Sequence, residues 1–232
     1  MTKRLLQLDI YRGIAVVLMV IFHFTYDLNY FGFIDADTTR LVFWIKLRLV
    51  ILSLFLSAVG MSLYLVYSKK FNIVKYKKRL YLLGASSMMI SVVTYFIFPK
   101  TWIYFGVLHM IFTASLVGPL FTKKPNIAGV LGVLLIALYL SGFRMTPLYD
   151  LLQGPLHLPM YHTEDLVSFV PWFGVVLLGI FAMHHKLLEM IPLPQHNYLE
   201  KFSWIGKHTL AIYLIHQPIL FAILGSLAYL LK

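Results

Sequence analysis

The stretch that decides the fold, Leu8–Phe31, reads LDIYRGIAVVLMVIFHFTYDLNYF. It is long and apolar enough to cross a bilayer as a helix, which takes about 20 residues. Yet it carries Asp9 and Arg12 at its start, and His23 and Asp27 further along. Ionisable groups at membrane depth are costly and by default indicate a functional site. The stretch therefore predicts a membrane helix with a site inside it.

Helical geometry places these four residues on one face. The step from Arg12 to His23 turns through about 1100°, which leaves the two residues roughly 20° apart. Asp9 and Arg12 are an i, i+3 pair and His23 and Asp27 an i, i+4 pair, so the members of each pair are neighbours. Helical rise separates Arg12 from His23 by about 16 Å, which is about half the hydrocarbon thickness. We expect one polar stripe that runs from the membrane surface to beyond its middle.

The rest of the chain has the same character. Of its 232 residues, 60% are hydrophobic and 12% charged, whereas a soluble domain carries about 25% charged residues. We predict an all-α, polytopic membrane helix bundle that forms a single transmembrane domain over residues 1–232. Because lipid offers no hydrogen bonds to the backbone, each spanning segment is expected to be helical. The seven segments expected to span are 10–31, 46–67, 80–98, 102–121, 126–143, 166–184 and 209–231.

Lysine and arginine predict the orientation of the chain. Thirteen of them fall in the N-terminus and alternate connections on one side, and six fall on the other side. The positive-inside rule then places the N-terminus in the cytoplasm. The basic residues behind the net charge of +11 thus serve to orient the chain and to contact anionic lipid, rather than to bind nucleic acid.

The outer connection over residues 144–165 is expected to be long and irregular. The chain has no cysteine, which excludes disulfide and thiolate chemistry.

The first helix offers catalytic and anion-binding groups. His23 has the residue type that exchanges a proton near neutral pH. Asp27, one turn on, is placed to orient the imidazole ring and to support its charged form. Arg12 has the geometry to bind a phosphate, with Asp9 holding it ready. Two plainer interpretations stay open: His23 as a helix-packing side chain, and Arg12 as an interfacial anchor.

Later segments add further candidates. His109 is expected some 10 Å deep by helical rise, close to the level of His23. For His216, a structural role and a functional role are equally expected. Asp165 is either a charge that favours a helix N-terminus or a carboxylate that binds a hydroxyl or amine. Trp172 is either an interface-belt residue or a platform for a sugar ring. No metal is expected, since two histidines and an aspartate on separate helices form no ligand-spacing signature.

Several motifs, taken in order, resemble one family. Arg12 and His23 are separated by ten residues, like the Arg-x10-His pattern of the membrane acyltransferase 3 family. The whole first segment is more closely similar to the heparan-α-glucosaminide N-acetyltransferase-like family of bacterial membrane proteins. Further motifs that fit this family are FLSAVGMS (55–62), FGVLH (105–109), VPWFG (170–174) and YLIHQP (213–218). The resemblance covers nearly the full chain.

The resemblance implies an acetyltransferase in the bacterial cytoplasmic membrane. It would move an acetyl group from cytoplasmic acetyl-CoA to an amine or hydroxyl of an extracytoplasmic glycan or glycolipid. His23 would act as general base or acetyl carrier, with Asp27 as its catalytic partner. The residues expected on the donor side are Arg12, Asp9 and His109. Those expected on the acceptor side are Asp165, Trp172 and His216. A homodimer and contact with membrane lipid are also expected.

Two other classes of function remain open. A transporter or flippase for a small polar or saccharide substrate would also need a polar path through the membrane. The chain shows no strong internal repeat, which counts against many transporter folds. A non-catalytic scaffold is the third class, and in it Arg12, His23 and Asp27 would be replaceable with little loss beyond stability. The distinguishing feature of an acetyltransferase is a site for CoA.

Overall fold

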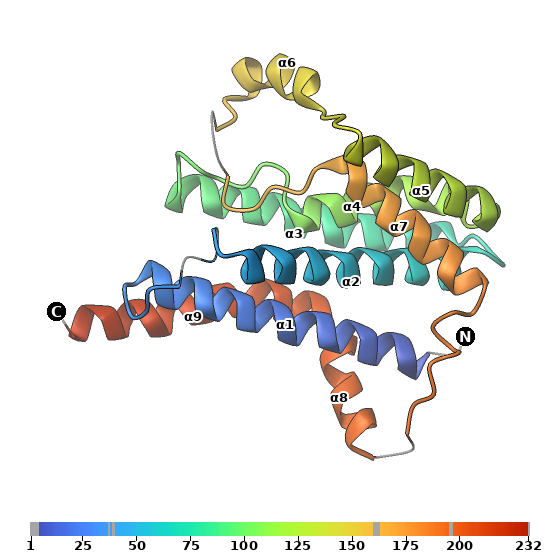
Figure 1. The fold of residues 1–232 in the computed structure, drawn as a ribbon, viewed down its shortest axis with the longest axis horizontal. Coiled ribbons are helices and arrows are strands. Elements are labelled where there is room, and N and C mark those ends of the chain that lie inside the picture. Colours follow the sequence, from blue (N-terminus) through green and yellow to red (C-terminus); the bar gives the residue numbers. More distant parts are fainter. Residues whose placement is uncertain (1–4, 37, 39, 160–162, 195–196, 232) are drawn as a thin grey trace. The chain divides into compact units, whose positions relative to one another are not determined.

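The computed structural model describes residues 5–36, 38, 40–159, 163–194 and 197–231. These residues form helices and connections without a β-strand, so the predicted all-α class is confirmed. In chain order the elements are α1 (Leu6–Tyr30), α2 (Val42–Tyr67), α3 (Ile73–Ile97), α4 (Val107–Val117), the 3₁₀ turn η1 (Gly118–Phe121), α5 (Pro125–Leu140), α6 (Thr146–Leu156), α7 (Phe169–His184), α8 (Asn197–Lys207) and α9 (Thr209–Leu230) (Figure 1).

Each of the seven predicted segments contains an apolar helix. Among the described residues, α1, α2, α3 and α9 are long and apolar enough to cross a membrane. The helical stretch of α4 and η1, together with α5 and α7, is apolar but shorter. The number of spans and the cytoplasmic position of the N-terminus stay predictions.

The expectation of an irregular segment over 144–165 is wrong for its first half, where α6 lies. A proline stands in the first turn of α6, a position that suits proline because the first helical N–H groups have no partner within the helix. The helix ends at Leu156, and the next residue, His157, has a left-handed φ of 50°, which is a common way for a helix to stop. Leucines at 148, 152 and 156 share one face at helical spacing, and this was the signal for a helix.

The described chain divides into two compact units. The first contains α1, α2 as far as Phe55, α8 and α9, and the second runs from Leu56 through α7 to Leu187. In the first unit, a buried cluster joins α1 to α2, and Ile205 and Ile212 pack against it from α8 and α9. The members of this cluster are Ala15, Val16, Met19, Ile51 and Phe55.

Glycine allows α8 to lie directly against α1 in the first unit. A Cβ on Gly206 would lie 1.7 Å from the backbone oxygen of Asp9. A Cβ on Gly13 would lie 2.8 Å from the ring of Phe202. Small residues permit such close backbone approach between helices. The start of α1, with Asp9 and Arg12, is therefore fixed against α8.

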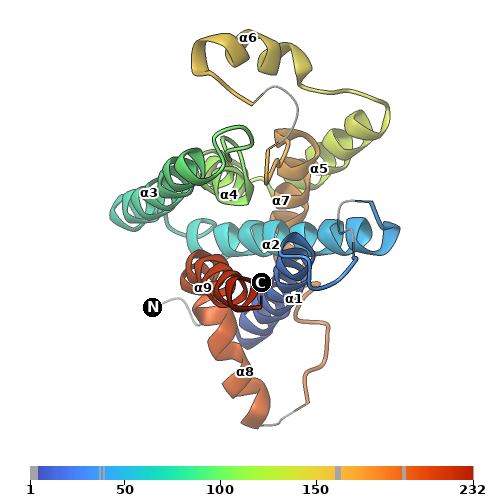
Figure 2. The same cartoon turned by 90° about the vertical axis from the view of Figure 1, so that its left-hand side faces the viewer.

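The second unit uses the same device where α2 meets α7. A Cβ on Gly60 would lie 1.9 Å from the backbone oxygen of Val176, and one on Gly179 would lie 2.2 Å from that of Ser57. The small residues of α2 and α7 thus permit close packing between these two helices. In the same unit α3 lies beside α4 (Figure 2). This contact brings Ser91 to the start of α4, where His109 stands.

Candidate active site

Polar side chains of α1 and α9 meet inside the first unit. The rings of His23 and His216 lie 4.9 Å apart between centroids, in an edge-to-face arrangement. The side-chain amide of Gln217 donates a hydrogen bond of 2.7 Å to Oδ1 of Asp27. Asp27 is completely buried. We call these four residues the α1/α9 polar cluster. It brings together the two residues expected to be catalytic and one of the three expected to bind the acceptor.

Backbone contacts fix the state of the His216 ring. Its Nδ1 lies 2.7 Å from the carbonyl oxygen of Tyr213 and 3.2 Å from that of Ile212. A carbonyl oxygen only accepts hydrogen bonds, so Nδ1 carries the hydrogen and donates it. In the neutral imidazole, Nε2 then holds a lone pair. His216 therefore presents a hydrogen-bond acceptor and a base.

Three buried atoms of the cluster make no hydrogen bond with the described part of the protein: Oδ2 of Asp27, Nε2 of His216 and Oε1 of Gln217. Leaving a buried polar atom unpaired costs about 1–3 kcal/mol, so such atoms are rare without a reason. All three are acceptors when Asp27 is a carboxylate, because Gln217 already directs its amide N–H at Asp27. The cluster can therefore bind a chemical group that carries several N–H or O–H donors.

The ion pair predicted at the start of the first helix is present. Nη1 of Arg12 lies 3.1 Å from Oδ1 of Asp9. The Asp9 side chain is 3% exposed and that of Arg12 25% exposed. A buried carboxylate thus holds a guanidinium that still reaches the surface. Helical rise sets Arg12 about 16 Å from His23 along α1.

His109 is held by contacts within the second unit. Its Nδ1 accepts a hydrogen bond of 3.2 Å from the backbone N–H of Gly106. Its Nε2 therefore carries the hydrogen, and it lies 2.9 Å from Oγ of Ser91. That hydroxyl in turn donates to the carbonyl of Ile103 at 2.7 Å. Through its two ring nitrogens, His109 links α4 to α3 and to the connection between them, and these contacts hold its ring in place. Its expected role in donor binding stays a prediction.

Asp165 lies at a helix N-terminus, as one of its two interpretations predicted, but the helix is α4. Its Oδ2 accepts a hydrogen bond of 2.9 Å from the backbone N–H of Val107, the first residue of α4. A Cβ on Gly106 would lie 2.7 Å from the same oxygen, so glycine leaves room for the cap. A carboxylate at this place also favours the helix dipole. From the sequence, the helix that would benefit from this charge was the one that follows Asp165. In the structure it is α4, whose first residue precedes Asp165 by 58 positions.

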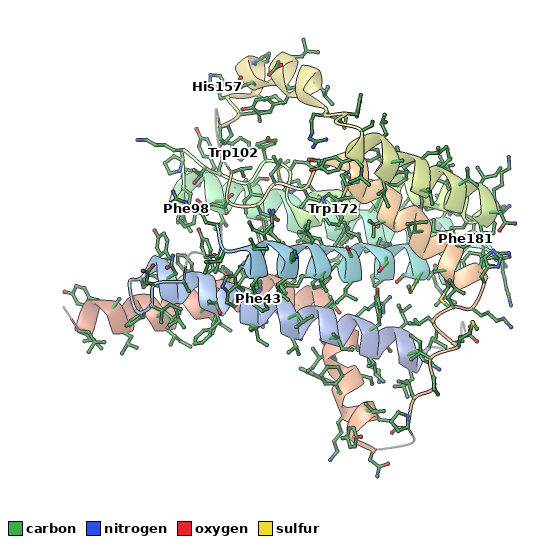
Figure 3. The ribbon with its side chains drawn as sticks, in the orientation of Figure 1. Phe43, Phe98, Trp102, His157, Trp172 and Phe181 are labelled. Carbon is green, nitrogen blue, oxygen red and sulfur yellow. The ribbon has the colours of Figure 1, made fainter. Side chains whose placement is uncertain are left out.

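Trp172 is half-buried at the start of α7 (Figure 3). The nearby segment 163–167 is tied to the connection before α4, since Thr163 donates to the carbonyl of Trp102 at 2.8 Å. Glu164 accepts a hydrogen bond of 2.6 Å from the Thr101 hydroxyl. The predicted site residues thus fall into two groups. The first unit holds Asp9, Arg12, His23, Asp27 and His216, and the second holds His109, Asp165 and Trp172.

Gln217 is the member of the cluster that sequence reasoning missed. An uncharged amide within an apolar span was its signal, because a membrane helix seldom carries such a group without a polar partner. Its place directly after His216 was a second sign. Within the described residues, no group of three or more histidine and acidic side chains is placed to hold a metal.

The helices and the cluster define a helical membrane protein with a polar site between two long apolar helices. A family model described as heparan-α-glucosaminide N-acetyltransferase, catalytic, matches residues 4–218. The chain therefore belongs to this family of membrane acetyltransferases, and the resemblance seen in the sequence is confirmed. Comparison with curated proteins and with solved structures found no match.

Proposed function

We propose that the protein transfers an acetyl group from cytoplasmic acetyl-CoA to an amine or hydroxyl of an extracytoplasmic glycan or glycolipid. The observation that carries the proposal is the set of three unpaired acceptor atoms on Asp27, His216 and Gln217. An amine or hydroxyl brings the N–H or O–H groups that such atoms need. The family membership supports the acetyl group as the cargo.

The α1/α9 polar cluster also suits the charge that develops during transfer. When an amine nitrogen attacks the thioester carbonyl, its N–H groups become more acidic and it gains positive charge. The carboxylate of Asp27 favours that charge, and the hydrogen bond from Gln217 keeps the carboxylate in place. Groups fixed in advance where charge develops stabilise the transition state rather than the bound substrate.

We assign to His23 the role of general base, which takes the acceptor proton, or of acetyl carrier, which takes the acetyl group itself. In direct transfer, the acceptor nitrogen or oxygen bonds to the acetyl carbon, the carbon–sulfur bond breaks, and the acceptor proton passes to His23 and on to the CoA thiolate. In the two-step route, a nitrogen of His23 bonds to the acetyl carbon, the carbon–sulfur bond breaks and the CoA thiolate leaves. The acceptor nitrogen or oxygen then bonds to the acetyl carbon, the bond to His23 breaks, and the acceptor proton passes to the freed imidazole. His216, whose ring lies against His23, holds the acceptor through Nε2.

We place the phosphates of the donor at Arg12. Guanidinium groups bind phosphate through two parallel hydrogen bonds, and Asp9 keeps this guanidinium at a fixed position. The acyl-bearing arm of CoA is an extended chain, so a nucleotide held near Arg12 leaves the thioester free to reach along α1 towards His23.

Transfer of radiolabelled acetyl from acetyl-CoA to an amino sugar tests the proposal in purified, detergent-solubilised protein. We expect His23→Ala to lower the rate at least about 100-fold, the usual size of a lost acid–base group. Thr25→Ala is the matched control, since Thr25 lies on α1 between His23 and Asp27 and its hydroxyl donates to the backbone carbonyl of Ile21 in its own helix. It should keep wild-type activity.

Thermal unfolding separates donor binding from chemistry. A ligand that binds only the folded state raises its apparent stability, so acetyl-CoA should raise the Tm of the wild type and of His23→Ala, and less so that of Arg12→Ala. No shift at millimolar acetyl-CoA, in folded wild-type protein that also lacks transfer activity, would refute the proposal and favour a transporter.

A further inference from the structure

The outward face of α8 carries an exposed tryptophan between cations. Trp204 is 58% exposed. Lys201 precedes it by three residues and Lys207 follows it by three, so both flank it on the helix surface. Both lysines are exposed as well. The opposite face of α8, with the buried Gly206, lies against α1.

The indole of Trp204 is held in place by its neighbour one turn on. Its ring and that of His208 lie 4.3 Å apart between centroids, with 36° between their planes. Nδ1 of His208 lies 2.8 Å from the carbonyl oxygen of Trp204 and donates to it. The two rings therefore form a preset aromatic surface, and the exposure of Trp204 leaves room for another flat group.

This face differs from that of a helix that only rests on lipid. Such a helix turns its tryptophan and its other apolar residues towards the membrane and its lysines away from it. On α8 the apolar side is instead used against α1, where Phe202 lies close to Gly13. Trp204 is left on the charged side, between Lys201 and Lys207.

A flat ring beside two ammonium groups has the chemistry of a nucleotide site. Stacking of a base on an aromatic side chain is worth about 1–3 kcal/mol and does not depend on the identity of the base. Lysine binds phosphate as a point charge. The carboxylate of α8, Glu200, is exposed in the first turn of the helix and lies one turn before Trp204 on the same face.

The position of α8 connects this face to the proposed donor path. Gly206 packs against the backbone of Asp9, and Phe202 against Gly13, so α8 lies at the level of Arg12 on α1. We propose that Lys201, Trp204, Lys207 and His208 bind the adenine of the acyl-CoA donor and share its phosphates with Arg12. This inference rests on the proposed function, because it names the part of the protein that recognises the donor.

Calorimetric titration of CoA, and separately of acetyl-pantetheine, into the detergent-solubilised full chain tests the inference. Acetyl-pantetheine has the acyl arm but lacks the nucleotide. Loss of stacking in Trp204→Ala should weaken CoA binding about 5- to 150-fold and leave acetyl-pantetheine binding unchanged. Tyr198→Ala is the matched control, because Tyr198 is a 59% exposed aromatic residue of α8 that lies about 120° around the helix from Trp204. It should bind CoA like the wild type.

The outcomes separate this inference from the proposed function. CoA binding that is undisturbed in Trp204→Ala, or weakened equally for CoA and acetyl-pantetheine, would overturn the α8 site while leaving acetyl transfer intact. CoA binding that depends on Trp204, in a protein that transfers no acetyl group to any amine or hydroxyl, would support the α8 site and refute the proposed function. A wild type that binds no CoA would overturn both.

Discussion

Gly206→Ala tests whether the start of α1 is fixed against α8. The new Cβ would lie 1.7 Å from the backbone oxygen of Asp9 and 2.6 Å from its carbonyl carbon. Real Cβ atoms essentially never approach another atom within 3.0 Å, and both atoms in conflict are backbone. No side chain can rotate away, so the two helices must separate by more than 1 Å.

The expected loss of stability follows from two opposing effects. Overpacking that forces backbone movement costs about 1–3 kcal/mol, and a conflict between two helix backbones belongs at the upper end of that range. Alanine gains about 1 kcal/mol over glycine in a helix interior. The net destabilisation is therefore about 2 kcal/mol, which lowers the Tm of a chain of this size by about 4–8 °C.

Thermal unfolding in detergent measures this difference, and Gly225→Ala is the control. Gly225 lies in α9 of the same unit, and its new Cβ would meet only the ring of Phe31, at 3.3 Å. That ring can shift by a few tenths of an ångström, and alanine favours the helix over glycine, so the Tm should be equal to the wild-type value or slightly higher. If Gly206→Ala were as stable as Gly225→Ala, the close contact of α8 with Asp9 would be disproved.

Three further substitutions have defined outcomes. Asp27→Asn replaces the carboxylate oxygen that faces the acceptor substrate with an N–H group. The lost charged hydrogen bond, about 1.5–3 kcal/mol, should lower kcat/KM about 10–150-fold. Unchanged transfer kinetics would exclude Asp27 from the site. Ser91→Ala leaves Nε2 of His109 unpaired and should lower the free energy of unfolding by about 1–3 kcal/mol, seen as a lower Tm. Ser91→Cys should lower the Tm less. Asp165→Ala removes the cap on Val107 and should cost about 1 kcal/mol; hydrogen exchange that is no faster in the first turn of α4 would contradict this.

The local parts of the site were predictable from the sequence. The ion pair of Asp9 with Arg12 follows from an i, i+3 spacing on a helix, and the structure contains it. The polar face of α1 follows from helical periodicity in the same way. The seven apolar segments each contain a helix because hydrophobic length and the need to satisfy backbone hydrogen bonds act within each segment.

Contacts between distant segments were not predictable in this way. Gln217 bonds Asp27 across 190 positions of the chain, and no spacing rule links residues so far apart. One of the two interpretations of Asp165 placed it at the N-terminus of the helix that follows it, yet it caps α4. His109 was placed level with His23 by depth alone, whereas its ring bonds are to Ser91 and Gly106.

By itself, the sequence determined the helices, the membrane setting, the family and the residues of α1 that carry charge. These depend on composition and on spacings within one helix. Tertiary structure alone decided that α9 brings His216 and Gln217 to His23 and Asp27, and that α8 lies against the start of α1. The reason is that helices choose partners through the close fit of their surfaces, as at Gly206, and that fit depends on all the helices packed together.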